Sequence, residues 1–129
     1  MPAFAHTRTL DAPMDQAEAR VREALSAEGF GVLTEIDIRA TLKAKLDVDM
    51  APYKVLGACN PPAAHRALQA EPLIGTMLPC NVVLRDAGDG RTEVAAVDPV
   101  ASMAAVENDA LGEIAGEIRD RLRRAVDAA

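Results

Sequence analysis

A hairpin pattern in the C-terminal half limits the folds open to this chain more than any other segment. Two apolar runs, residues 77–86 and 91–98, flank the sequence DAGDG at residues 86–90. Asp and Gly are the residues that tight hairpin turns favour. Because strands joined by so short a turn pair antiparallel, the pattern predicts an antiparallel sheet that includes both runs.

Three earlier segments are also predicted to be strands, and helices are predicted between them. The strands are expected at residues 4–10, 30–38 and 53–59, where Val32, Thr34, Ile36 and Ile38 are expected to share one face of the second strand. A helix is expected after residue 10, capped by Asp11 and ended by Gly29 in a left-handed conformation. A shorter helix is expected over residues 38–50.

The last helix is predicted to be the longest. It is expected to begin at Asp98–Pro99, and its apolar residues recur at helical spacing over about seven turns: Met103, Val106, Ala110, Leu111, Ile114, Ile118, Leu122 and Val126. Together the elements predict an α+β fold in which a single, mainly antiparallel sheet packs against helices, with a long C-terminal helix.

Composition narrows the class of protein. A length of 129 residues suits a single domain, residues 1–129. Phe4, Phe30 and Tyr53 are the only aromatic residues, so the core must be aliphatic and stacking platforms for bases are missing. The net charge of −6 disfavours binding to the phosphates of nucleic acid.

The sequence also predicts no association with membranes. No apolar run approaches the roughly 20 residues that span a bilayer, and the first residues lack the pattern of a signal peptide. We therefore expect a cytoplasmic protein, in which cysteines stay mostly reduced.

The two cysteines of the chain lie in similar settings, because each is followed by asparagine. Asn60 is a residue that caps helices and Pro61 suits a first helical turn, so Cys59 is expected between a strand and a helix N-terminus. Backbone N–H groups at such a position can lower the pKa of a thiol. Cys80 follows Pro79 at the expected start of another strand, and the two thiols meet if these strands are neighbours.

Three interpretations of the thiols are open from the sequence. They are small buried core residues, a reactive or redox pair, or part of a metal or cofactor site with His65 as a third donor. Cysteines twenty-one positions apart match no zinc-finger spacing, so no metal ligands are assigned. Patterns typical of dinucleotide, P-loop, zinc-protease and serine-hydrolase sites are missing, which leaves any enzymatic activity and cofactor unassigned.

Several segments in combination resemble one known family. They are Gly29–Phe30–Gly31, Leu42 with Lys45, Tyr53, residues 56–61 (LGACNP), Ile74–Gly75, residues 78–81 (LPCN) and Asp98–Pro99. From about Asp11 to about Ala125 the chain resembles the prokaryotic domain-of-unknown-function family numbered 302. The resemblance implies a small α+β fold with an antiparallel sheet, a homodimer, and no assigned activity.

These observations predict a homodimeric ligand-binding or accessory protein with a site near the two Cys-Asn motifs. The alternatives are a thiol-based redox or metal-handling protein, and a structural or interaction module whose cysteines only pack. The expected ligand is small and either anionic or thiol-reactive, because asparagine side chains and helix N-termini bind such groups. The candidate ligand-binding residues are Cys59, Asn60, Cys80, Asn81, His65 and Asp98.

Overall fold

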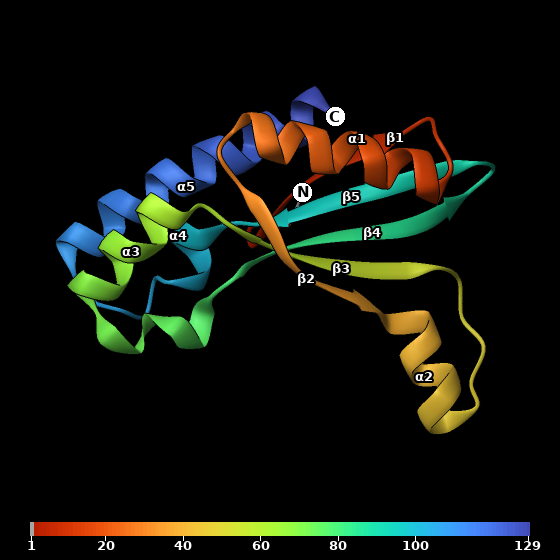
Figure 1. Ribbon diagram of the computed structural model, residues 1–129, viewed down its shortest axis with the longest axis horizontal. Coiled ribbons are helices and arrows are strands. Elements are labelled where there is room, and N and C mark those ends of the chain that lie inside the picture. Colours follow the sequence, from red (N-terminus) through yellow and green to blue (C-terminus); the bar gives the residue numbers. More distant parts are fainter. Residues whose placement is uncertain (1) are drawn as a thin grey trace.

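The computed structural model describes residues 2–129 and contains one sheet with helices (Figure 1). Its five strands are β1 (Ala5–Leu10), β2 (Gly31–Asp37), β3 (Tyr53–Cys59), β4 (Cys80–Gly88) and β5 (Arg91–Val97). They lie in the order β1-β5-β4-β3-β2, and every neighbouring pair is antiparallel. The predicted α+β fold with an antiparallel sheet is therefore confirmed.

The helix α1 (Met14–Ala27) follows β1 and packs over the sheet. The prediction that Asp11 caps this helix is wrong, because the N-cap residue is Pro13 and no side chain caps the first turn. The predicted stop is confirmed: Gly29 has a φ of +84°, a left-handed conformation that glycine adopts readily.

The strand β2 differs from the prediction in one respect. A β-bulge between Val32 and Thr34 inserts one residue, so Val32 pairs with Ala58 whereas Thr34 pairs with Gly57. Since one extra residue reverses the alternation of faces, Val32 and Thr34 lie on opposite faces rather than the same one. Ile38 also leaves the strand, because it is the first residue of the helix α2 (Ile38–Leu46).

The final helical segment is interrupted. A short helix α4 (Pro99–Ser102) follows β5, and the long helix α5 (Asp109–Ala128) begins only after Asn108, whose side chain accepts a hydrogen bond from the backbone N–H of Leu111 at 3.1 Å. The prediction of one continuous helix from Asp98 is therefore wrong. Asn108 provides a second start signal, because asparagine satisfies the free N–H groups of a first turn.

The core lies between one face of the sheet and the helices α1 and α5. The sheet contributes the fully buried Leu56, Val82, Leu84, Val94 and Ala96, and α5 contributes the predicted apolar stripe from Leu111 to Val126. Figure 1 shows α1 and α5 on the same side of the sheet, so that these two helices leave the opposite face uncovered. We call that second surface the open face.

Two shorter elements connect β3 to β4. The helix α3 (Pro61–Ala70) begins directly after β3, and the 3-10 helix η1 (Pro72–Met77) leads back to the sheet. None of the helices within residues 2–129 is long and apolar enough to cross a membrane.

Candidate functional site

The two Cys-Asn motifs come together at one end of the sheet, because β3 and β4 are neighbours. Cys80 pairs with Ala58, the residue that precedes Cys59. Cys80 is buried among the core residues at 5% exposure, whereas Cys59 is partly exposed, and neither forms a disulfide. The two thiols thus have neighbouring backbone positions but different surroundings.

Burial determines the acidity of both thiols. Burial, and to a smaller extent the charge of the neighbouring Cys59, raise the pKa of Cys80 from 9.0 to about 11. Burial also raises the pKa of Cys59. The hypothesis that the helix N-terminus lowers the pKa of Cys59 is therefore wrong. Both thiols are protonated at neutral pH, which weighs against the reactive-thiol interpretation.

Asn60 has a structural role at the start of α3. Its side-chain oxygen accepts a hydrogen bond from the backbone N–H of Ala63 at 3.2 Å, and its amide nitrogen donates to the carbonyl oxygen of Glu28 at 3.5 Å. A side chain on Gly29 would approach that amide to 3.0 Å. Asn60 thus caps one helix and contacts the end of another.

Two of the predicted site residues, His65 and Asp98, lie outside β3 and β4, the strands that carry the thiols. His65 is exposed on α3. Asp98 caps α4 by accepting hydrogen bonds from the N–H groups of Val100 and Ala101, and it forms an ion pair with Arg123 at 3.3 Å. Within residues 2–129 no three His, Cys, Asp or Glu side chains are grouped so that they could hold a metal ion, so the proposed donors Cys59, Cys80 and His65 do not converge on one.

Asn81 is the predicted site residue that lines a cavity. Cys80 points to the core, and since successive side chains of a strand point to opposite faces, Asn81 lies on the open face. There it borders a groove of about 300 Å³, whose lining also includes Phe4, Tyr53, Val83, Arg85 and Ala95. This volume is at the lower end of the range for small-molecule sites.

An apolar row forms the middle of the open face. Ile36 pairs with Val55, Val55 with Val83, and Val83 with Ala95, so these four side chains cross four strands in register. Val55, Val83 and Ala95 are only partly buried, and Ile36 is 46% exposed. Such a row on a face that helices leave uncovered is a typical contact surface for another molecule.

Polar side chains border this row on both sides. On one side Tyr53 pairs across the sheet with Arg85, and the Nε of Arg85 forms an ion pair with Glu93 at 2.6 Å. On the other side Asn81 pairs with Gly57. A side chain at Gly57 would collide with Thr34 and would approach Pro79 to 2.7 Å, so glycine is required there.

The sequences of β4 and β5 contain a signal for this groove that the predicted site residues did not include. The runs VVL in β4 and VAAV in β5 are apolar at consecutive positions, so they place apolar side chains on both faces. A strand that is solvated on one face alternates instead. The continuous runs therefore indicated a second apolar face, which contains Val83, Ala95 and Val97.

The fold and this surface define a small α+β protein with one helix-covered and one open sheet face. The chain belongs to the family described as "Domain of unknown function DUF302", whose model matches residues 6–129. It is similar to the uncharacterized conserved protein DUF302 from Bacillus stearothermophilus, known from a crystal structure. The two are 32% identical, with a TM-score of 0.90 over 98% of each chain. No curated protein matches the chain.

Proposed function

We propose that this protein is a ligand-binding or accessory protein that binds a small molecule in the groove on the open face, beside the Cys80–Asn81 motif. The observation that carries this proposal is the apolar row bordered by polar groups on a sheet face that α1 and α5 leave uncovered. A cytoplasmic location is part of the proposal, because two free, protonated thiols suit a reducing compartment.

The chemistry of the groove suggests the class of ligand. Val83 and Ala95 favour a flat apolar body, while the Asn81 amide and the Tyr53 hydroxyl offer hydrogen bonds at opposite ends. The Arg85 guanidinium can also bind an anionic group, although its ion pair with Glu93 reduces its free charge. We therefore expect a small amphipathic molecule that carries an anionic or hydrogen-bonding group.

The chain contains a built-in reporter for this test. Tyr53 is the only tyrosine, and there is no tryptophan, so the intrinsic fluorescence comes almost entirely from the groove. We expect the apolar anionic dye 1-anilinonaphthalene-8-sulfonate to bind saturably and to quench the emission of Tyr53. The substitution Tyr53→Phe should abolish the emission and identify its source.

A matched pair of variants locates the binding. Ala95→Glu places a charge on the apolar groove floor and should weaken dye binding at least about tenfold. Ala19→Glu makes the same change at an exposed position of α1, on the other side of the sheet, and should leave binding unchanged. Equal affinities in the two variants, or no saturable binding by the unmodified protein, would contradict the proposed site.

A further inference from the structure

A second cavity lies on the side of the sheet that faces α1. It has a volume of about 260 Å³ and lies where the starts of α1, α2 and β3 meet. Lys54 pairs with Asp37 across β3 and β2, and its ammonium group reaches Glu18 of α1. We call this hollow the charged cavity, and its lining consists of Met14, Asp15, Glu18, Asp37, Arg39, Pro52, Tyr53 and Lys54.

A ring of ion pairs forms one wall of the charged cavity. Lys54 contacts Glu18 at 2.7 Å and Glu35 at 2.6 Å. Arg22 contacts the same two carboxylates, at 2.9 Å and 3.7 Å. Two positive and two negative groups therefore neutralise one another, and these contacts leave them little capacity to bind a ligand. The ring joins α1 to β2 and β3 and so fixes the position of this wall.

Three charged side chains of the lining lie outside this ring. Asp15 and Asp37 each accept one backbone hydrogen bond at 2.9 Å. The second oxygen of each carboxylate has no partner within residues 2–129, and neither has the guanidinium group of Arg39. The cavity therefore offers two carboxylates and one guanidinium group that are available to a ligand.

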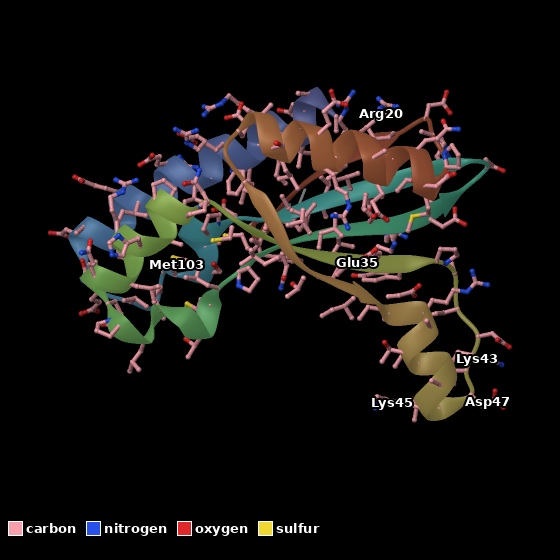
Figure 2. The ribbon with its side chains drawn as sticks, in the orientation of Figure 1. Arg20, Glu35, Lys43, Lys45, Asp47 and Met103 are labelled. Atoms are coloured by element: carbon pink, nitrogen blue, oxygen red, sulfur yellow. The ribbon has the colours of Figure 1, made fainter. Side chains whose placement is uncertain are left out.

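Only the first turn of α2 borders the charged cavity. Figure 2 shows Lys43, Lys45 and Asp47 at the far end of α2, away from Glu35 in the sheet. There the ammonium group of Lys43 forms ion pairs with Asp47 at 2.9 Å and Asp49 at 3.1 Å. Since none of these groups belongs to the lining, the available charges of the cavity are two negative and one positive.

We propose that the charged cavity binds a free basic amino acid of the lysine or arginine type. Such a molecule carries two positive groups and one carboxylate at neutral pH, which is the inverse of the available charges. The guanidinium group of Arg39 suits the carboxylate of the ligand, because its donors match that group in geometry. The two positive groups of the ligand suit Asp15 and Asp37, and the apolar stem suits Met14 and Pro52.

The size of the cavity and the charge of the chain agree with such a ligand. A volume of about 260 Å³ lies just below the roughly 300 Å³ at which sites for drug-sized molecules begin. The cavity therefore suits a molecule of the size of one amino acid. The net charge of −6 also raises the local concentration of a positively charged ligand.

The test compares lysine with three analogues that each lack one charged group. Isothermal titration calorimetry at low ionic strength should show saturable binding of lysine to the unmodified protein. Norleucine lacks the side-chain ammonium group, 6-aminohexanoate lacks the α-ammonium group, and 1,5-diaminopentane lacks the carboxylate. Each analogue should bind at least about tenfold more weakly, because one available charge of the cavity stays unpaired.

Matched variants assign the groups. Asp15→Asn and Arg39→Gln should each weaken lysine binding at least about tenfold, and Arg39→Gln should also remove the preference for lysine over 1,5-diaminopentane. The controls Asp120→Asn and Arg119→Gln make the same changes on α5, which contributes no residue to the lining, and should leave lysine binding unchanged. Circular dichroism should show that all four variants are folded.

Three results would overturn this inference. They are the absence of saturable lysine binding up to about 10 mM, equal affinities for lysine and 1,5-diaminopentane in the unmodified protein, and equal lysine affinities in Arg39→Gln and Arg119→Gln. Because neither Asp15 nor Arg39 lines the groove of the open face, these outcomes are independent of the proposed ligand function.

Discussion

The two Cys-Asn motifs have the same sequence, but their cysteines and their asparagines have different surroundings and roles. At the end of β3, Cys59 is partly exposed and Asn60 caps a helix. At the start of β4, Cys80 is a core residue and Asn81 is exposed at the groove. The difference arises because the first motif ends a strand and the second begins one. Identical dipeptides therefore do not indicate identical roles.

Thiol labelling should reveal the largest difference between the motifs. A thiol reagent such as 5,5′-dithiobis(2-nitrobenzoate) should modify Cys59 in the native protein, because its side chain is partly exposed. Cys80 should react only through unfolding, which slows its labelling at least roughly a thousandfold at typical stabilities of 5–15 kcal/mol. Single Cys→Ala variants assign each phase. Fast labelling of Cys80 in folded protein would remove the distinction.

Alkaline pH should destabilise the protein through Cys80 in particular. Its pKa is raised from 9.0 to about 11 in the folded state, so above pH 9 the unfolded chain loses a proton that the native state keeps. Stability should therefore fall between about pH 9 and 11, by about 3 kcal/mol for a shift of two pKa units. Urea unfolding across this range measures the effect.

Two variants make that measurement specific. Cys80→Ala should flatten this part of the pH profile, whereas Cys59→Ala should leave most of it in place. A pH profile that is unchanged in Cys80→Ala would show that another group causes the alkaline loss.

Replacing each asparagine should have a smaller effect. One substitution should lower mainly the stability, and the other should weaken mainly the dye binding. Asn60→Ala removes a helix cap and should lower the free energy of unfolding by about 1 kcal/mol without affecting dye binding. Asn81→Ala should change stability by less than about 0.5 kcal/mol, because the side chain is exposed, but should weaken dye binding severalfold. Urea titration and the Tyr53 quenching assay measure the two effects. A shared effect on both properties would show that the motifs act as one unit.

Much of the fold could be predicted from local patterns. The turn at residues 86–90, the alternating apolar residues and the stop at Gly29 each act within a few residues, so they correctly indicated the strands, the hairpin and the end of α1. The bulge at β2 could not be predicted in the same way, because it depends on how the strand meets its neighbour, as when Thr34 aligns with Gly57 rather than with Ala58. The break before α5 had a local signal, the capping residue Asn108, which the prediction of one continuous helix did not include.

Less of the candidate site than of the fold could be predicted from the sequence, because the site depends more on the tertiary structure. The sequence indicated six site residues. The structure brings the backbones of four of them together where β3 meets β4, namely Cys59, Asn60, Cys80 and Asn81. The side chains of Asn60 and Asp98 cap helices. The groove residues come from three strands, with Tyr53 on β3, Val83 and Arg85 on β4 and Ala95 on β5, and strand pairing brings the three groups together.

By itself the sequence determined an aliphatic, acidic α+β protein, because composition and short-range periodicity are properties of the chain alone. Only the tertiary structure decided which thiol is buried, which face of the sheet α1 and α5 leave uncovered, and that α2 buries none of its residues. These features depend on strand order, register and helix placement, which are set by contacts between residues distant in the chain.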